Sequence, residues 1–313
     1  MPPLDPQAKR FLHMLAASGM PNRSDLTPEK MRQAMLRLER TIGIKGIPIG
    51  RIERRDLPSV GGLLPVRIYV PAAINSTRSP AIVYFHGGAG VFCSVDTHDG
   101  LCRMLANKSG CRVVSVDYRL APEHRFPAAV EDSYFATRWV SEHAWELDID
   151  PNHIAVAGDS FGGTLAAVVC QLAKQMKAPT IALQVLFCPI TDVHADTESR
   201  KTYKEGYFFE LPTFEWALGH YCSPGADYQD PRVSPLHAMD FADLPPAHIH
   251  TAELDPLRDE GKAYAERLRC AGVPVRYTCH EGMIHHFYGM AGIIPYARLA
   301  IQAVGAAIKE SLR

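Results

Sequence analysis

The chain of 313 residues contains one short segment with the pattern of an activated serine. Residues 158–162 read Gly-Asp-Ser-Phe-Gly, after an apolar run at 153–157 and before an Ala- and Val-rich stretch. A serine in this pattern lies on a sharp strand-to-helix turn, where side chains at 158 and 162 would collide. The turn would expose the Ser160 hydroxyl and place the Phe161 N–H at a helix N-terminus, where a developing oxyanion would lie. A serine that only caps the helix is the alternative interpretation.

Two later loops supply the acid and the base that such a serine needs. A serine hydroxyl is a poor nucleophile until a base takes its proton, and a carboxylate must hold that base in one tautomer. Asp255 follows the strand-like run 248–252, and His285 and His286 follow the strand-like run 275–280. The chain order serine, acid, histidine is that of α/β-hydrolases and differs from the chymotrypsin and subtilisin orders.

Both positions have rival residues nearby. Asp259 and Glu260 also follow the first of these two runs. Acidic residues in the first turn of a helix are expected because they complement the helix dipole, so Asp255 is the preferred acid. His285 and His286 are neighbours on an extended loop, where adjacent side chains point apart, so only one of them can face the serine.

A run of small residues provides the electrophilic part of the site. Residues 86–90 read His-Gly-Gly-Ala-Gly and follow the apolar run 81–85. Small side chains let backbone N–H groups approach a substrate carbonyl, as in the H-G-G-G loop of esterases. We therefore predict an oxyanion-binding loop here, and a tight turn with no catalytic role is the alternative.

The segments that position these motifs alternate between strand and helix. Short apolar or alternating runs predict strands at 64–70, 81–85, 112–116, 153–157, 183–187, 248–252 and 275–280. Amphipathic segments predict helices at 97–108, 127–143 and 161–176. This alternation predicts the α/β fold class, with a mostly parallel central sheet and helices on both faces.

Two further segments break the alternation and predict a helical cap. Residues 1–45 read as two helices, the second of which begins at Thr27-Pro28, an N-cap followed by proline. Residues 192–225 form an insertion between parts of the core, which comprises residues 46–191 and 226–313. The candidate pocket residues of this insertion are aromatic: Tyr203, Phe208, Phe209, Phe214 and Trp216. The alternative is that these aromatics are ordinary packing contacts of a peripheral helix.

Composition excludes several classes of protein. There are 33 Lys and Arg against 34 Asp and Glu, with no block of five like charges, so nothing indicates a nucleic-acid partner. No run approaches the roughly 18 consecutive apolar residues of a membrane span. Eight cysteines, none in a C-x-x-C pair, are too few for a disulfide scaffold, and free thiols are expected. We expect a soluble, cytoplasmic protein with no membrane partner.

Taken together, the motifs resemble the hormone-sensitive-lipase family of carboxylesterases, bacterial family IV, of the α/β-hydrolase superfamily. The motifs that carry this resemblance are at 86–89, 117–129, 158–163, 255–260 and 281–285. It covers roughly residues 50–313. The string at 117–129, Asp-Tyr-Arg-Leu-Ala-Pro-Glu-His-Arg-Phe-Pro-Ala-Ala, is the most specific part, although it has no evident catalytic role.

The resemblance implies which residues react. The nucleophile falls on Ser160, the acid on Asp255 and the base on His285, and this is the reason to prefer His285 over His286. It also implies that a cap made from the N-terminal segment and the later insertion covers the site.

The oxyanion hole follows from the same resemblance. Its donors are the N–H groups of Gly88, Ala89 and Phe161, on a loop supported by His86 and Gly87. The family usually has glycine at the position of Ala89 and alanine at that of Phe161. Ala89 keeps its N–H, so this donor is retained unless the backbone there needs a positive φ. The Phe161 ring either narrows the pocket or packs away under the cap.

The function predicted is that of a serine carboxylesterase, which hydrolyses small apolar esters through an acyl-enzyme with no metal and no organic cofactor. The partner is a small ester, and the resemblance also implies a homodimer through the last strand, 275–280. A related hydrolase of lactones, amides or thioesters would use the same groups. A ligand-binding module, as in plant gibberellin receptors that lack the histidine, is a second alternative, and zinc at His248 and His250 is a third.

Overall fold

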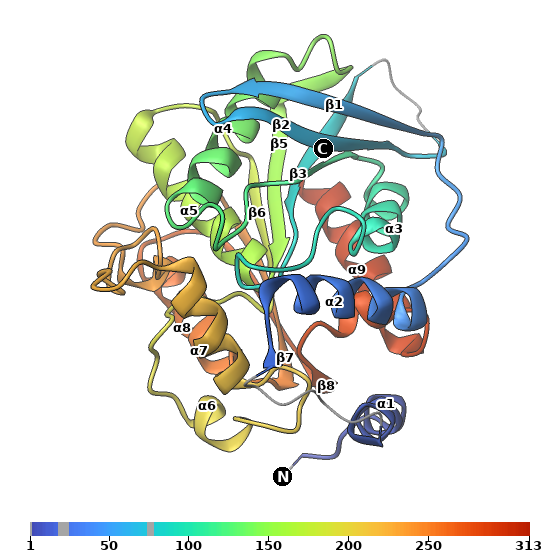
Figure 1. Cartoon of the computed structure of the whole chain (residues 1–313). Coiled ribbons are helices and arrows are strands. Elements are labelled where there is room, and N and C mark those ends of the chain that lie inside the picture. The colour runs from blue at the N-terminus through green and yellow to red at the C-terminus, as the bar shows by residue number, and fades with distance from the viewer. Residues whose placement is uncertain (1, 18–24, 74–77) are drawn as a thin grey trace.

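The centre of the molecule is one eight-stranded sheet (Figure 1). The structure is a computed structural model of the chain and describes residues 2–17, 25–73 and 78–313. The strands are β1 (Arg51–Ser59), β2 (Gly62–Val70), β3 (Ser79–Phe85), β4 (Arg112–Val116), β5 (Ile149–Asp159), β6 (Leu183–Phe187), β7 (Ala247–Leu254) and β8 (Val275–Ile284). Their order across the sheet is β1-β2-β4-β3-β5-β6-β7-β8.

The sheet is mostly parallel, which confirms the predicted fold class. Only β2 runs against its neighbours β1 and β4, and every pair from β4 to β8 is parallel. The carboxyl ends of these parallel strands therefore meet at one end of the sheet, which is where ligands bind in open α/β sheets. The predicted strands at 112–116 and 183–187 match β4 and β6 to the residue.

The strand β1 was not predicted, because its sequence shows no apolar alternation. It lies at the edge of the sheet and pairs with β2. Of its nine residues Leu57 is the buried one, and charged side chains occupy most of the rest. An edge strand held by backbone hydrogen bonds needs little apolar surface of its own.

Helices cover both faces of the sheet. On one face lie α3 (Asp99–Ser109) and α9 (Pro295–Ser311), which pack on each other, and the other face carries α4 (Ala128–Glu142), α5 (Phe161–Met176) and α8 (Arg258–Cys270) (Figure 1). The predicted helix at 161–176 matches α5 to the residue.

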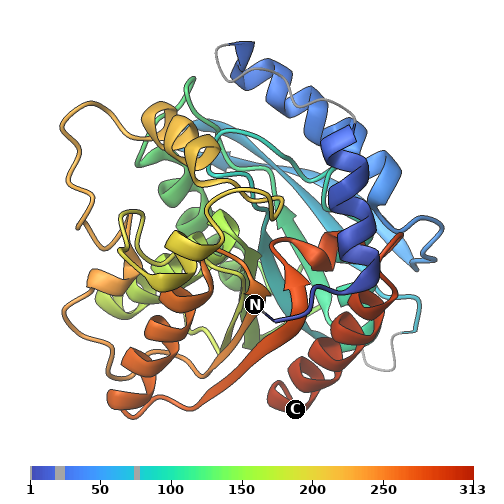
Figure 2. The same cartoon turned by 90° about the horizontal axis from the view of Figure 1, so that it is seen from below.

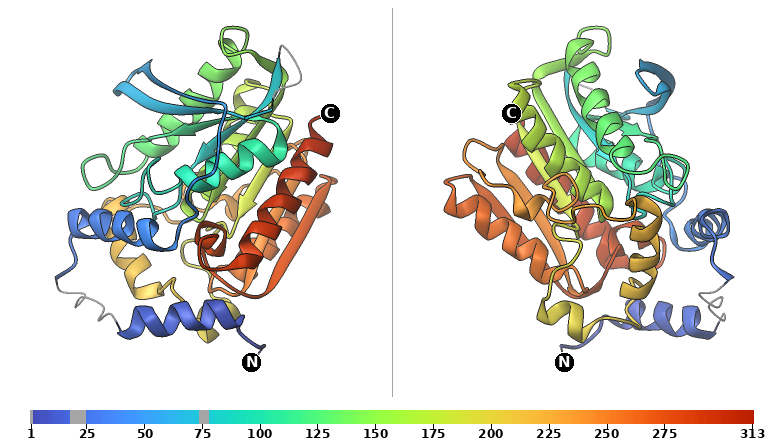
Figure 3. Two further views of the ribbon diagram at one scale, coloured as in Figure 1. Left: turned by 90° about the vertical axis from the view of Figure 1, so that its right-hand side faces the viewer. Right: turned by 60° about the vertical axis from the view of Figure 1, so that its left-hand side comes forward.

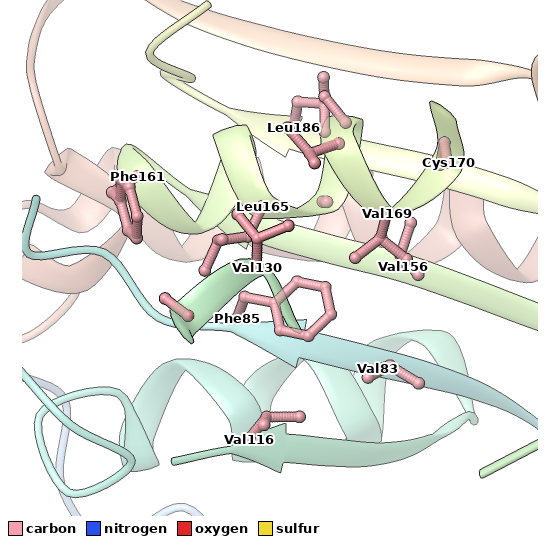
Figure 4. Packing of buried hydrophobic residues seen from close by; sticks show 14 of the residues in the cluster. Val83, Phe85, Val116, Val130, Val156, Phe161, Leu165, Val169, Cys170 and Leu186 are labelled. Atoms are coloured by element: carbon pink, nitrogen blue, oxygen red, sulfur yellow. The ribbon is translucent and has the colours of Figure 1, made fainter. Parts of the chain in front are cut away.

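Each face of the sheet has its own hydrophobic core. Beneath α5, side chains of β3, β5 and β6 interlock with Leu165 and Val169, which are 0% exposed (Figure 4). Burying one such side chain contributes about 1.5–3 kcal/mol. The start of α5 is thereby fixed against the ends of three strands.

The segments predicted to form the cap lie at the carboxyl end of the sheet. The N-terminal part contains α1 (Pro6–Ala17) and α2 (Pro28–Ile42), and the insertion contains α6 (Glu198–Thr202) and α7 (Leu211–Tyr221). Seen from below, the blue N-terminal helices and the gold α7 flank the same end of the sheet (Figure 2), and the side views agree (Figure 3). Of the predicted segment 1–45, residues 1 and 18–24 lie outside the described residues.

The predicted start of the second N-terminal helix is confirmed. Thr27 is the N-cap of α2, its hydroxyl accepts the Lys30 N–H at 3.2 Å, and a proline occupies the first turn. Two short 3-10 helices, η2 (Pro235–His237) and η3 (Phe287–Met290), complete the elements used below. Within the described ranges, no helix has both the length and the apolar character needed to cross a bilayer. All eight cysteines are free, and six of them are buried.

Candidate active site

Ser160 lies on the turn that joins β5 to α5. Its φ of 54° and ψ of −119° are rare for a residue with a Cβ, so this backbone is strained. A Cβ at Gly158 would lie 2.2 Å from the Gly162 carbonyl, and one at Gly162 would lie 1.9 Å from the Phe85 oxygen. Both glycines are therefore required by close contact, as the sequence predicts.

Asp255 and His285 contact each other in a buried setting. The Nδ1 of His285 lies 2.8 Å from Oδ2 of Asp255, and the two side chains are 5% and 0% exposed. A carboxylate only accepts hydrogen bonds, so Nδ1 carries the proton and Nε2 is left as the basic nitrogen. The other oxygen of Asp255 accepts the Leu257 N–H at 2.9 Å, which fixes the carboxylate. The arrangement is that of an imidazole held in one tautomer for proton transfer.

The turn with the serine and the loop with the histidine meet at the same end of the sheet. The Ser160 N–H donates to the Phe187 oxygen at 2.8 Å, which joins the turn to the end of β6. Asp159, which precedes Ser160, also contacts His286, which follows His285: Nδ1 of His286 lies 3.3 Å from Oδ2 of Asp159. The two adjacent histidines thus have different carboxylate partners.

The rival acids hold the insertion instead. Asp259 accepts the Ser199 N–H at 2.8 Å, at the start of α6. Glu260 is buried and pairs with Arg200 of α6, with an oxygen 2.6 Å from the guanidinium. These two contacts join α8 to the insertion, so neither residue is needed to explain the position of His285.

The oxyanion loop has three consecutive residues with positive φ, Gly88, Ala89 and Gly90. Gly88 has φ 109°, and a Cβ there would lie 2.0 Å from the Phe92 oxygen, so only glycine fits. Ala89 has φ 51°, a left-handed conformation that costs an L-residue about 1–2 kcal/mol. The exception stated for the Ala89 donor therefore applies, because the backbone has a positive φ there. Ala89 adopts this φ with strain, and it keeps its N–H as a possible donor.

The base of this loop is held by buried hydrogen bonds. Tyr118 donates its hydroxyl to the His86 oxygen at 2.7 Å, and the two rings stack with centroids 4.3 Å apart. The His86 imidazole contacts the Gly87 oxygen at 2.7 Å, and burial lowers its pKa to about 3, so the ring is neutral. His86 and Gly87 therefore support the loop from behind.

Asp159 is a site residue that sequence reasoning missed. Its carboxylate is buried and accepts the Gly87 N–H at 3.0 Å and the Tyr84 hydroxyl at 2.6 Å, besides contacting His286. It also lies 3.0 Å from Nε2 of His98. One carboxylate thus joins the serine turn, the oxyanion loop and the histidine loop. The only sequence signal was a charged residue inside an otherwise apolar turn.

His98 faces Asp159 as a cation. Thr97 donates its hydroxyl proton to the Ser94 oxygen at 2.8 Å, so Nδ1 of His98, 2.9 Å away, must donate to Thr97. Its Nε2 lies 3.0 Å from the Asp159 carboxylate and accepts a longer contact of 3.5 Å from the Gly87 N–H, and the shorter contact favours an imidazole that donates from both nitrogens, which is the protonated form. Burial alone would lower the pKa of His98, but the Asp159 carboxylate raises it overall. Burial alone would raise the pKa of Asp159, but His98 and His286 hold it well below its ordinary range.

Two of the five predicted pocket aromatics lie against the histidine loop. The Phe209 ring is 4.6 Å from that of His285, centroid to centroid. The Phe208 ring stacks on His286 at 6.2 Å and also contacts Phe11 of α1 at 5.6 Å. The insertion and the N-terminal helices therefore meet over the histidines.

The other three aromatics are packing contacts of the insertion. Tyr203 and Phe214 are 4% and 5% exposed, and Trp216 packs on His220 with centroids 4.8 Å apart. These contacts fit the alternative of packing within a peripheral helix, but Phe214 also lies 5.7 Å from Phe209, centroid to centroid, and the place of the three residues in the pocket stays a prediction.

The Phe161 ring packs against α7, in the segment predicted to form the cap. It is 6% exposed, lies 4.9 Å from the Tyr221 ring of α7 and 6.2 Å from that of Tyr118, and occupies the first turn of α5 (Figure 4). The sequence left open whether this ring narrows the pocket or packs under the cap, and the second arrangement is the one observed.

Two side-chain groups in the described part of the chain have the composition of a metal site. They are His98, Asp159 and His286, and Cys188, Asp255 and His285, with candidate ligand atoms within 4.8 Å of one another. In each group the carboxylate already pairs with imidazole, which suits proton transfer and positioning.

The residues of the zinc alternative contact other partners. Nε2 of His248 lies 3.2 Å from the Ser311 hydroxyl, and Nδ1 of His250 lies 3.3 Å from Nε2 of His280. Burial lowers the pKa of His248 to about 4. His248 thus contacts α9, and the His250 contact joins the last two strands.

Comparison with known proteins agrees with the fold and with the motifs. A family model described as the α/β-hydrolase fold matches residues 82–289. Carboxylesterase NlhH of Mycobacterium tuberculosis is 40% identical over 272 residues, which are 85% of this chain and 84% of that protein. Ethyl acetate hydrolase of Pseudomonas putida is 41% identical over 254 residues, 80% of each chain.

A solved structure is similar over nearly the whole molecule. The hyperthermophilic esterase from the archaeon Pyrobaculum calidifontis superposes with a TM-score of 0.93 at 40% identity, covering 98% of both chains. The resemblance read from the motifs is confirmed. The chain belongs to the hormone-sensitive-lipase-like, family IV carboxylesterases of the α/β-hydrolase superfamily, and it is a carboxylic ester hydrolase.

Proposed function

We propose that the chain hydrolyses small apolar esters through an acyl-enzyme, with Ser160 as nucleophile, His285 as base and Asp255 as the carboxylate that orients His285. The observation that carries this proposal is the buried contact of 2.8 Å between His285 and Asp255, at the same end of the sheet as the strained turn of Ser160. A hydrolase needs a histidine and an acid to activate its serine, whereas a ligand-binding module has no use for either group.

In the first half-reaction, Nε2 of His285 takes the Ser160 proton as the serine oxygen attacks the ester carbonyl carbon. The tetrahedral intermediate then breaks its bond to the alcohol oxygen, which leaves with the proton from His285. In the second half-reaction, water gives a proton to His285 and attacks the acyl carbon. The bond between that carbon and the Ser160 oxygen then breaks, His285 returns the proton to Ser160, and the acid leaves. Asp255 stays ionised and stabilises the imidazolium in both halves.

The oxyanion of each intermediate would accept hydrogen bonds from the backbone N–H groups of Gly88, Ala89 and Phe161. One such donor typically lowers the barrier by about 2.7–4 kcal/mol. The buried contact of Gly87 with Asp159 supports this role, because it fixes the loop before any substrate is bound. Preorganised donors need no reorientation during the reaction.

Substrate size follows from the cap. We propose that residues 1–45 and 192–225 form this cap over a core of residues 46–191 and 226–313, with Phe208 and Phe209 closing the apolar side of the pocket. Ser160 and His285 are 6% and 4% exposed beneath these segments. The similarity to an ethyl acetate hydrolase supports short acyl and alcohol groups.

The assembly and the cellular location are part of the same proposal. Strand β8 is the last of the sheet, so its outer edge at 275–280 is available to pair with a second copy. We propose a homodimer through this edge. Eight free cysteines, as in proteins of a reducing compartment, support a cytoplasmic location.

The test is a panel of 4-nitrophenyl esters of graded acyl length, with Ser160→Ala and Asp255→Asn beside the parent protein. Asp259→Asn is the matched control, because Asp259 is an acid of the same loop region that contacts α6. We expect Ser160→Ala and Asp255→Asn to lose activity, and Asp259→Asn to keep it at temperatures where it is folded. Binding of an ester by the parent protein with no turnover would favour the ligand-binding module.

A further inference from the structure

The segment 117–129 is the most specific motif of the sequence, and the proposed chemistry does not use it. In the structure it contacts both parts of the cap and the oxyanion loop. Arg125 donates to the Gly219 and Cys222 oxygens at the end of α7, at 3.0 and 2.7 Å. The Phe126 N–H donates to the Tyr221 oxygen at 2.9 Å. The segment therefore seats the insertion on the core.

The N-terminal part of the cap reaches the same segment through Arg32 of α2. The Arg32 guanidinium forms a two-pronged ion pair with Glu123, at 2.8 and 2.7 Å. It also donates to the Ala121 oxygen at 2.9 Å and to the Val91 oxygen at 2.9 Å. Four planar donor contacts from one guanidinium fix its orientation in a way that a lysine could not.

Val91 and Ala121 connect Arg32 directly to the oxyanion loop. The Val91 N–H donates to the Gly88 oxygen at 2.9 Å, which closes the tight turn over Ala89. The Ala121 N–H donates to the Gly90 oxygen at 2.8 Å, on the other side of that turn. Arg32 thus donates to the carbonyl oxygens of Val91 and Ala121, and the N–H groups of these same two residues hold the loop.

We propose that Arg32 is a positioning residue for the oxyanion hole, so that seating of the N-terminal cap helix α2 and alignment of the Gly88 and Ala89 N–H groups are coupled. This rests on the proposed function of that loop. Because Ala89 holds a left-handed backbone without the help of a glycine, its turn needs external support. Glu123 neutralises the guanidinium and fixes its plane, and its pairing with Arg32 lowers its pKa to about 2, so the pair persists at working pH.

The test compares Arg32→Ala, Arg32→Lys and Glu123→Gln with Arg51→Ala. Arg51 pairs with Glu53 at 2.6 Å on the exposed edge strand β1, so it is a matched control for the loss of an ion pair. The first readout is kcat and KM on 4-nitrophenyl acetate, a substrate with little cap contact. We expect Arg32→Ala to lower kcat about tenfold or more with KM within about threefold, because a small misplacement of donors acts on the transition state. Arg32→Lys should keep only part of the parent kcat, and Glu123→Gln should lower kcat less than Arg32→Ala does.

Guanidinium ion supplies a positive control on the same variant. A cleft of about 520 Å³, lined by Arg32 and Glu123 among others, makes this place accessible to a small cation. Added guanidinium should raise kcat of Arg32→Ala, and ammonium at the same ionic strength should not. A purely structural role of Arg32 would not produce this difference.

Hydrogen exchange of residues 86–93 gives a readout that does not need turnover. We expect these amides to exchange at least about fivefold faster in Arg32→Ala and at the parent rate in Arg51→Ala, since local opening sets the exchange rate. Parent-like kcat or parent-like exchange in Arg32→Ala would overturn the proposal. If Arg32→Ala does not fold, Arg32→Lys and Glu123→Gln decide by the same criteria. A parent protein that fails to hydrolyse esters would overturn the proposed function, while the exchange data would still decide the role of Arg32.

Discussion

At the scale of single residues, two Asp–His contacts serve different purposes. Asp255 contacts His285, which it orients in the proposed mechanism, whereas Asp159 contacts His286, His98 and the oxyanion loop. The second carboxylate lies beside Ser160 and connects three segments whose relative positions decide the reaction. It is therefore the residue outside the proposed triad whose substitution should change the chemistry most.

Replacing Asp159 by Asn removes the charge and keeps the volume. We expect kcat to fall about 10–100-fold with little change in KM, because misaligned groups lose transition-state binding. Asp150→Asn is the control, since Asp150 lies at the other end of β5 and pairs with His153 at 3.0 Å on the surface. Active-site titration corrects for unfolded protein. An Asp159→Asn protein with parent kcat would show that the carboxylate only stabilises the fold.

Substitutions at Ala89 measure how much its left-handed backbone conformation costs in stability and activity. Ala89→Gly suits a φ of 51° and keeps the N–H, so we expect activity within about threefold of the parent. Ala89→Val places a β-branched residue in the left-handed region, which should cost about 1–3 kcal/mol of stability and lower kcat. Urea unfolding and ester kinetics on both variants measure these effects. Equal behaviour of glycine and valine would contradict the conformational argument.

The ion pair of His98 and Asp159 predicts how stability varies with pH. The raised pKa of His98 contributes stability that is full below its unfolded value of about 6.5 and is lost as pH rises through the folded value. The lowered pKa of Asp159 contributes stability that is present above about 3.8 and is lost as pH falls.

We therefore expect the difference in unfolding free energy between the parent and His98→Gln to be largest between about pH 4 and 6.5 and to shrink above that range. Urea titrations at a series of pH values measure this difference. A difference that grows from pH 6.5 to 8.5 would mean that His98 is neutral in the folded protein.

At the scale of elements, apolar periodicity predicted the strands and helices that the core buries. Both β6 and α5 match to the residue, because every position of β6 and most of α5 face apolar neighbours. The edge strand β1 escaped prediction because hydrogen bonds to β2, rather than buried side chains, hold it there. Apolar periodicity in a sequence reflects which side chains are buried, so an element that buries few side chains shows little apolar periodicity.

The candidate site could be predicted where its residues follow buried strands. Ser160, Asp255 and His285 follow strands that the sequence reveals, and parallel strands bring their carboxyl ends together. The contacts of Asp159 and Arg32 could not be read from the sequence, because their partners are backbone groups or lie up to 127 residues away. Aromatic content alone likewise did not separate Phe209, which contacts His285, from Tyr203, which is buried in the insertion.

The insertion is joined to the core by a buried ion pair whose removal has a predictable cost. Arg200→Met leaves the Glu260 carboxylate, which is 0% exposed, without its partner, and should destabilise the fold by about 3–5 kcal/mol. Arg232→Met, which breaks a more exposed pair with Asp230, should cost about 0–1 kcal/mol. Thermal and urea unfolding compare the two. Equal losses would show that the insertion does not depend on this contact.

At the scale of the whole molecule, the sheet, the two cap segments and the edge at β8 have separate tasks. In the proposed function, the sheet collects the reacting groups at one end, and the cap would exclude water from them, which would strengthen every electrostatic contact there. The edge of β8 is partly covered, because the Asp5 N–H donates to the Gly282 oxygen at 3.0 Å. The proposed pairing of two copies would thereby be limited to 275–280.

The proposed dimer should be visible in light scattering over a range of protein concentrations. We expect a mass of two chains at micromolar concentration, and slower hydrogen exchange in 275–280 than in the edge strand β1. Backbone pairing protects amides, while an open edge leaves them exposed to water. A mass of one chain at every concentration would contradict the dimer and leave the active site unaffected.

The proposed mechanism requires a covalent intermediate at Ser160. Rapid mixing with excess 4-nitrophenyl acetate, followed by acid quench and peptide mass spectrometry, measures it. We predict a burst of nitrophenol equal to one per active chain, with the acetyl group on the peptide that contains Ser160, and neither signal in Ser160→Ala. Turnover with no burst and no acylated peptide, or an unchanged rate in Ser160→Ala, would contradict the proposed mechanism.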